Sequence, residues 1–152
     1  MWPDALRRQR TGNARHDGKR AHKRRPVTVE SYYADQANIT CNPATSCSLF
    51  FARIPMGKWV FLRRVTCQLL FGGEVLRINL TTSANGSTVN FSRMDGLIPV
   101  HVAFSAFHYY TVNQDTQFVF AQRAYPAVYA VATPSAEMTF TCRIVGEISS
   151  IP

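Results

Sequence analysis

The residues best suited to chemistry are cations clustered near the N-terminus. Seven arginines and two lysines lie within residues 7–25. A guanidinium offers planar donors that match phosphate oxygens, and each phosphate neutralised by a cation releases condensed counterions. The cluster therefore predicts tight, salt-sensitive and sequence-independent binding to RNA or DNA. The candidate nucleic-acid-binding residues are Arg7, Arg8, Arg10, Arg15, Lys19, Arg20, Lys23, Arg24 and Arg25.

Charge divides the chain into two unequal parts. In residues 1–25 nine cations face two acids, Asp4 and Asp17, for a balance of +7; residues 26–152 hold eight cations and seven acids, for +1. The first part has too few apolar side chains to offset the roughly 1 to 2 kcal/mol per residue that ordering a backbone costs. Residues 1–25 are therefore expected to form a basic arm that stays disordered until a polyanion binds it.

Other roles of the arm remain open to different degrees. The basic cluster His22–Arg25 also fits a nuclear localisation signal, as a main or additional role. A membrane-surface helix is disfavoured because the arm has no regular apolar face. Asp4 and Asp17 count against a transit peptide, which is poor in acids.

Catalytic and metal-binding patterns are not found in the remainder of the chain. The seven acids are isolated from one another in sequence, and His101 and His108 are the only histidines after the arm. His101 lies in an alternating apolar stretch, where a place on one strand face is the simpler interpretation. No glycine-rich loop precedes a helical pattern, so nucleotide binding lacks its usual context. We expect neither an enzyme nor a bound cofactor or metal.

The four cysteines, Cys41, Cys47, Cys67 and Cys142, form no C-x-x-C pair. The last three lie among alternating apolar residues, where a buried free thiol is the usual outcome. The chain opens with polar residues rather than a secretory signal, and no stretch approaches the roughly 20 apolar residues of a membrane span. Cytosolic synthesis without membrane attachment is therefore expected. An even cysteine count leaves disulfides formally allowed, but a reducing cytosol argues against them.

After the arm, apolar and polar residues alternate with the period of β-strands. Residues 26–45 are expected to form an extended connector and residues 46–152 a single domain. Eight or more short strands without a convincing amphipathic helix predict an all-β sandwich. The expected strands are Val27–Tyr33, Ser46–Ile54, Trp59–Leu70, Val75–Thr81, Ser87–Ser92, Leu97–Phe104, His108–Val112, Gln117–Gln122, Val128–Ala132 and Glu137–Ile148.

Local irregularities add detail to this pattern. Alternation in Trp59–Leu70 is interrupted at Arg63–Arg64, so a β-bulge is expected there. Pro99 cannot donate to a strand ladder and should lie near an edge or a strand end. Glycine chemistry predicts three tight turns, of which the first should close a hairpin. These turns are at Phe71–Glu74, Asn85–Gly86 and Asp95–Gly96.

Three aromatic dipeptides add a clue about association. Neighbouring residues of a strand point to opposite faces, so one member of each pair should face outward. Outward aromatic side chains can anchor contacts between copies; base stacking is the competing role. The pairs are Tyr32–Tyr33, Phe50–Phe51 and Tyr109–Tyr110.

Taken together, a basic arm, an extended connector and one β sandwich resemble a small icosahedral virus coat protein. The closest types are the coat proteins of plant satellite viruses and a minimal tombusvirus-like shell domain. In motif, only Ala52–Val65 is similar: there, as in those shells, an apolar-Pro-x-Gly turn separates two strands.

The resemblance implies a single jelly-roll sandwich of about eight antiparallel strands over residues 46–152. It further implies sixty copies in a closed shell, with the nine arm cations bound to packaged genomic RNA. Lys58, Arg63 and Arg64 are expected to add to the inner surface. The calcium-binding carboxylate pairs of related shells have no counterpart here. The expected localisation is the virion after synthesis in the host cytoplasm, with nuclear entry left open.

Three alternatives remain. A single-stranded DNA virus coat protein shares the basic arm and the jelly roll, and phosphate contacts do not distinguish RNA from DNA. A cellular nucleic-acid-binding β domain with a basic tail would act as a monomer. A secreted ligand-binding sandwich would give meaning to the four N-x-[ST] sequons at Asn38, Asn79, Asn85 and Asn90, but it needs a secretory signal.

Overall fold

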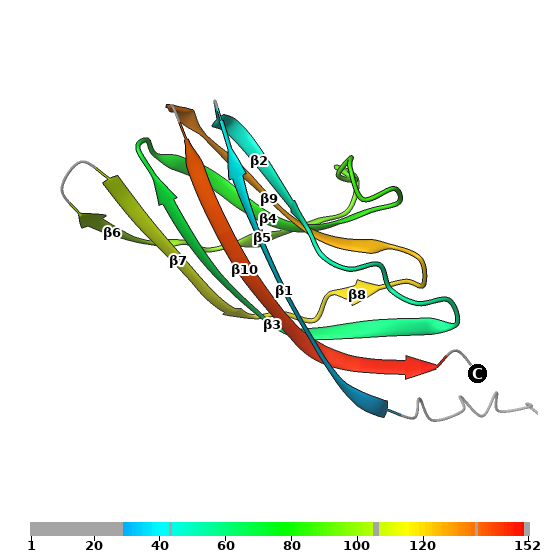
Figure 1. Ribbon diagram of the computed structural model, residues 1–152. Coiled ribbons are helices and arrows are strands. Elements are labelled where there is room, and N and C mark those ends of the chain that lie inside the picture. The colour runs from blue at the N-terminus through cyan, green and yellow to red at the C-terminus, as the bar shows by residue number, and fades with distance from the viewer. Residues whose placement is uncertain (1–28, 43, 105–106, 136, 151–152) are drawn as a thin grey trace, which may run out of the picture.

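The structure is a computed structural model that describes residues 29–42, 44–104, 107–135 and 137–150 (Figure 1). The nine candidate cations of the arm lie outside these residues. Within them the regular structure is entirely β. The strands are β1 (Val29–Cys41), β2 (Ala44–Phe50), β3 (Lys58–Phe71), β4 (Val75–Ser83), β5 (Met94–Leu97), β6 (Val100–Phe104), β7 (Phe107–Asp115), β8 (Val119–Phe120), β9 (Tyr125–Ser135) and β10 (Met138–Ser150).

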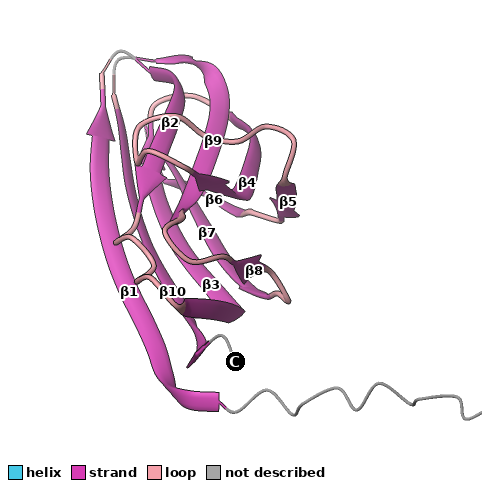
Figure 2. Ribbon diagram, turned by 90° about the vertical axis from the view of Figure 1, so that its right-hand side faces the viewer, coloured by secondary structure: helices cyan, strands magenta, loops and turns pink. Residues whose placement is uncertain are grey.

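Two antiparallel sheets pack face to face as a sandwich (Figure 2). The six-stranded sheet has the order β1-β10-β3-β7-β6, with β8 paired to the beginning of β3, and the four-stranded sheet has the order β2-β9-β4-β5. The expected all-β sandwich is confirmed.

The ladders are nested along the chain. If β6 and β8 are set aside, the first strand pairs with the last (β1 with β10), the second with the second last (β2 with β9), β3 with β7, and β4 with β5. Such nesting means that the chain folds back on itself as one long double ribbon, which then rolls so that alternate pairs fall in opposite sheets.

The core lies between the sheets and consists of the inward-facing residues of each strand. Alternation is clearest in β3 and β10, where every second side chain is buried. Side chains of both sheets interdigitate in a single apolar cluster, as sheet packing requires. Its largest fully buried members include Leu49, Leu62, Leu69, Phe71, Ile78, Leu80, Phe120, Met138, Phe140 and Ile144.

Strand β1 falls within the segment expected to be a connector. It pairs with β10 from Val29 to Cys41 and forms an edge of the six-stranded sheet. The carboxylate of Asp35 also accepts a hydrogen bond from the Ala52 backbone nitrogen at 2.8 Å, which ties β1 to the segment after β2. The described part of the connector is therefore extended and belongs to the sandwich.

The bulge expected at Arg63–Arg64 is confirmed. In the backbone ladder Arg64 is opposite Val145 and Leu62 is opposite Gly146, so no residue of β10 is in register with Arg63. As a result Arg63 and Arg64 both point outward while alternation resumes on either side. Gly146 permits this arrangement, because a Cβ there would collide with the backbone carbonyl oxygen of Phe61.

The hairpin expected at Phe71–Glu74 is wrong. β3 and β4 lie in different sheets, and the connection crosses from one to the other. Gly73 is required there by space rather than by a positive φ, since a Cβ would lie 2.7 Å from the Thr133 hydroxyl oxygen. The turn at Asn85–Gly86 is confirmed, and Gly86 has a φ of 74°.

Two further local predictions are wrong. The segment 87–92 forms a loop instead of a strand, and Asp95–Gly96 lies within β5 instead of a turn. The loop replaces ladder bonds with its own side-chain bonds: the Asn85 side-chain oxygen accepts hydrogen bonds from the backbone nitrogens of Ser87 and Thr88, each at 2.9 Å. The expectation for Pro99 is confirmed, because it lies between β5 and the edge strand β6.

All four cysteines form disulfides, which corrects the expectation of free thiols. Cys41 pairs with Cys47, and Cys67 on β3 pairs with the directly opposite Cys142 on β10. The ladder brings Cys67 and Cys142 together across 75 residues of sequence. Disulfides persist in oxidising surroundings, so the two bonds favour such an environment, although only weakly.

Candidate nucleic-acid interface

The described chain begins at one end of the six-stranded sheet. Val29 at the start of β1 is paired with Ser149 of β10, and Ser150 is paired with Lys58 at the start of β3. The predicted binding residues 7–25 lie outside the described part, so the structure does not place them. Any site in the sandwich that cooperates with the arm is best sought at this end, which we call the arm end.

Of the three cations expected to supplement the arm, only Lys58 lies at the arm end. Its Nζ donates a hydrogen bond to the Ser150 hydroxyl at 2.8 Å. Arg63 and Arg64 lie further along β3 on the outer face of the six-stranded sheet, and each faces a carboxylate. Arg63 binds Glu147 through two contacts, of 3.1 and 3.3 Å, and Arg64 Nε lies 2.8 Å from Asp115 Oδ1.

These ion pairs should lower the affinity of Arg63 and Arg64 for phosphate. The hydrogen bond from Arg64, and then its charge, lower the pKa of the Asp115 carboxyl, and the same pair raises the pKa of Arg64. Asp115 therefore stays ionised over the whole physiological range. A phosphate that approaches either arginine meets a guanidinium whose charge a carboxylate already balances.

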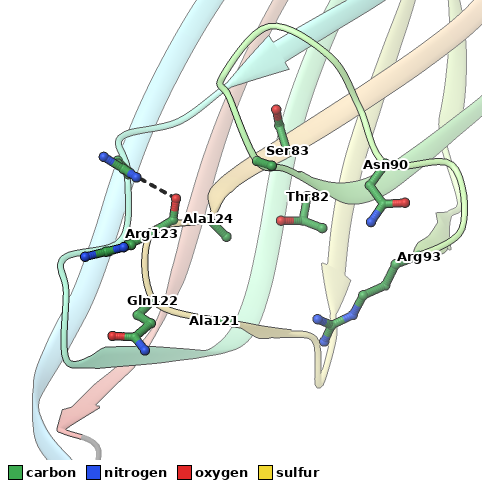
Figure 3. A pocket seen from close by; sticks show the side chains of 10 residues that line it. Thr82, Ser83, Asn90, Arg93, Ala121, Gln122, Arg123 and Ala124 are labelled. Carbon is green, nitrogen blue, oxygen red and sulfur yellow. Dashed lines mark hydrogen bonds between the residues drawn. The ribbon is translucent and has the colours of Figure 1, made fainter.

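A different group of cations lines a pocket of about 300 Å³ on the loops at the arm end (Figure 3). We call it the arginine pocket, because three arginines and no acidic residue line it. Arg93 approaches from the loop after β4, and Gln122 and Arg123 lie on the opposite side, in the turn after β8. The lining residues are Arg53, Thr82, Ser83, Ala84, Asn90, Arg93, Ala121, Gln122, Arg123 and Ala124.

The walls of the arginine pocket are fixed by backbone hydrogen bonds. Ile54 and the 123–124 turn exchange two of them, from the Ile54 nitrogen to the Ala124 oxygen and from the Arg123 nitrogen to the Ile54 oxygen, both at 2.9 Å. On the other wall the Thr81 hydroxyl donates to the backbone oxygens of Asn90 and Arg93, at 2.8 and 3.0 Å. The loops that carry the arginines are therefore held in place before any ligand arrives.

Each of the three guanidiniums is positioned by neutral groups. Arg53 Nε donates to the Arg123 backbone oxygen at 3.0 Å, and Arg93 Nη2 donates to the Val119 backbone oxygen at 2.6 Å. Arg93 also lies over the Phe118 ring, 4.9 Å from its centre. Among the described residues no carboxylate lies within ion-pair distance of Arg53, Arg93 or Arg123. Within the described part of the chain, the arginine pocket thus holds three cations that form no ion pair.

Arg123 also adopts an uncommon backbone conformation. Its φ is 64°, and it is the one non-glycine residue with positive φ in the described chain. A non-glycine residue in this region costs of order 1 to 2 kcal/mol, and such residues concentrate at functional sites.

Sequence reasoning did not identify these three arginines. They are 40 and 30 positions apart in sequence, and only the sandwich topology brings their loops to one end. A weak signal was present: Arg53 and Arg123 have no acidic residue within four positions on either side.

At the opposite end, the outer face of the six-stranded sheet carries exposed apolar side chains. Leu70 is paired with Tyr109, and Tyr109 with Val102, so the three form a row across β3, β7 and β6. Val100 and Phe107 lie beside the row and are 60% and 55% exposed. We call these five residues the apolar row. Figure 1 shows β6 far from the C-terminal end of β10.

The aromatic dipeptides behave as expected, with one member of each more buried than the other. Tyr32 is 67% exposed while Tyr33 packs against the core, and Phe51 and Tyr110 are buried while their neighbours are half-exposed. Burial raises the pKa of the Tyr33 hydroxyl well above its usual range, and the nearby Asp35 carboxylate adds to the effect.

The two histidines of the sandwich lie side by side. His101 Nε2 is 2.7 Å from His108 Nδ1, and the ring of Tyr110 stacks on His101. Among the described residues no three histidine, cysteine or acidic side chains gather in the manner of metal ligands. The part of the chain that the structure describes also contains no helix suited to crossing a membrane.

Comparison with models of known protein families gives no match to this chain, and neither does comparison with curated proteins.

Proposed function

We propose that this protein is a viral coat protein that assembles into a small icosahedral shell and packages single-stranded RNA through its basic arm. The observation that carries the proposal is the division of charge, +7 in residues 1–25 against +1 in the remaining 127. A nearly neutral β sandwich is suited to contacts with its own copies, and a dense cationic segment is suited to a polyanion.

The strand order supports assignment of the sandwich as a jelly roll. Eight strands joined by nested ladders and divided between two four-stranded sheets define that fold, which recurs in capsid proteins and also in lectins and cupins. Here β1-β10-β3-β7 and β2-β9-β4-β5 correspond to the two sheets, with β6 and β8 as additions to the first. Because jelly rolls serve several functions, the fold supports the proposal only together with the arm.

The apolar row supports self-association. Its aliphatic and aromatic side chains lie on a sheet face next to the edge strand β6, and contiguous exposed apolar groups of this kind mark interaction sites. The row is at the end opposite to Lys58 and the arginine pocket. Contacts between copies and contacts with nucleic acid would therefore use separate parts of the molecule.

A nuclease-protection experiment tests the packaging role. The full chain and a variant with all nine arm cations changed to glutamine are expressed, and RNA that resists ribonuclease is extracted from the purified material. The proposal predicts long protected RNA with the wild-type chain and a loss of at least tenfold in the variant. Equal protection by both would refute the role of the arm.

The shell is proposed to contain sixty identical copies, the smallest closed icosahedral arrangement. Negative-stain microscopy of the wild-type protein should show uniform spherical particles. A population of monomers and dimers alone, with RNA present, would instead favour a cellular nucleic-acid-binding β domain.

A further inference from the structure

We infer that the arginine pocket is a binding site for the phosphate backbone of the packaged strand, separate from the basic arm. The inference rests on the proposed function for its ligand, a phosphodiester, but on the described sandwich for its geometry. It assigns Arg53, Arg93 and Arg123 as phosphate ligands.

The chemistry of the lining fits an oxyanion. A guanidinium has five N–H donors and no acceptor. Arg53 and Arg93 each use one donor group in the hydrogen bonds described above, and Arg123 Nη2 donates one hydrogen bond to the Met56 sulfur at 3.6 Å. Several donors of each arginine therefore remain for a ligand. Thr82, Ser83 and Asn90 add neutral polar groups on the wall from which Arg93 comes.

The pocket arginines also differ in their ionic partners from the arginines on the outer face of β3. Arg63 and Arg64 are each neutralised by a carboxylate on an adjacent strand. The three arginines lie on two sides of the pocket, Arg93 on one side and Arg123 with Arg53 on the other, and their contacts are with carbonyl, thioether and aromatic groups.

The backbone of Arg123 provides an independent indication. Glycine adopts a φ of 64° without the steric cost that arginine bears there. The presence of arginine at this strained position supports a role for its guanidinium. The pocket is also at the end of the sandwich where the described chain begins.

Salt dependence of strand binding tests the site. Full-length wild type and single variants Arg53→Gln, Arg93→Gln and Arg123→Gln are titrated with a 20-nucleotide oligouridylate at several sodium chloride concentrations, below the concentration at which particles form. Each lost phosphate contact lowers the slope of log affinity against log salt by about 0.7 for a single strand. Arg77→Gln is the matched control. It removes an exposed charge on the same four-stranded sheet, about 17 Å from Thr82 along β4 at the usual rise per residue.

Arg123→Gly separates binding from folding. Removal of the strained side chain should raise the midpoint of thermal unfolding, and the salt slope should still fall as in Arg123→Gln. Inorganic phosphate, added at constant ionic strength, tests for a free anion: wild type should gain thermal stability and Arg93→Gln should not.

The pocket is refuted if all three glutamine variants behave as Arg77→Gln does in both measurements. If inorganic phosphate stabilises wild type but the pocket variants do not change the salt dependence of oligonucleotide binding, the pocket binds phosphate but not the nucleic acid strand. The nine-glutamine arm variant distinguishes the two proposals. If the slope of log affinity against log salt falls only in that variant, the pocket does not bind the strand and the proposed role of the arm stands. If the slope falls only in the pocket variants, the proposed role of the arm is refuted.

Discussion

The two disulfides should differ in their contribution to stability, and the difference follows from topology. Cys67–Cys142 closes a loop across 75 positions, whereas Cys41–Cys47 closes one across six. If a disulfide acts mainly by restricting the unfolded chain, the loop lengths give about 4.5 kcal/mol for the first bond and about 2 kcal/mol for the second at 25 °C. Loss of Cys67–Cys142 should therefore lower the free energy of unfolding about twice as much as loss of Cys41–Cys47.

The assay is urea unfolding of three proteins: wild type, the Cys67→Ala/Cys142→Ala variant and the Cys41→Ala/Cys47→Ala variant. Because Cys67 and Cys142 are both buried, their truncation also removes packing. Wild type unfolded with and without a reductant provides a control in which no atom is deleted. Equal losses in the two variants, or a larger loss for Cys41–Cys47, would refute the reasoning from loop length.

Three further predictions concern single residues. Tyr33→Phe should raise the free energy of unfolding by about 1 kcal/mol, because the buried hydroxyl has no hydrogen-bond partner among the described residues. Because the folded-state pKa of Tyr33 is raised, wild type should also lose stability above about pH 10, where the unfolded tyrosine ionises first; an unfolding series from pH 8 to 11 that shows the same loss in both proteins would contradict this. Asp115→Asn should remove a small stabilisation that wild type shows above about pH 4 and loses as pH falls through the lowered pKa of the carboxyl. The urea midpoints of the two proteins should therefore differ more at pH 7 than at pH 2.5, and an equal difference at both would contradict this. Gly146→Ala should cost roughly 1 to 3 kcal/mol by overpacking against β3, whereas Gly96→Ala, whose added Cβ meets nothing within 4 Å, should not; equal thermal midpoints in the two glycine variants would argue against the bulge geometry.

Strands with strong local patterns could be predicted from the sequence. The alternation of Trp59–Leu70 located β3, and its interruption located the bulge. Both were readable because each residue that faces the core is apolar whatever its strand pairs with. The same holds for Glu137–Ile148 and β10. A strand with one solvent-exposed and one buried face shows this alternation in its sequence.

Pairing between distant segments could not be predicted. The glycines of Phe71–Glu74 have the composition of a hairpin, but β3 pairs with β10 and β7, which follow it by dozens of residues. The disulfides could not be predicted for a similar reason. Four cysteines allow three connectivities and also free thiols, and only the register of β3 on β10 brings Cys67 opposite Cys142.

In the candidate site, too, the local part could be predicted from the sequence and the part assembled from distant segments could not. The arm cations form a compact cluster in sequence and were predicted from it, although they lie outside the described residues. The arginine pocket is assembled from three loops, so no spacing in the sequence indicates it. Charge was also misleading for Arg63 and Arg64, because their partners Glu147 and Asp115 are remote in sequence.

The division of labour between sandwich and arm is tested most directly by the mass and nucleic acid content of the native material. Size-exclusion chromatography with multi-angle light scattering and absorbance at two wavelengths measures both in one run. For a 17.1 kDa chain, sixty copies correspond to about 1.0 MDa of protein. The account predicts a particle of that protein mass with RNA inside. A peak at the mass of one or two chains, in the presence of RNA, would contradict it.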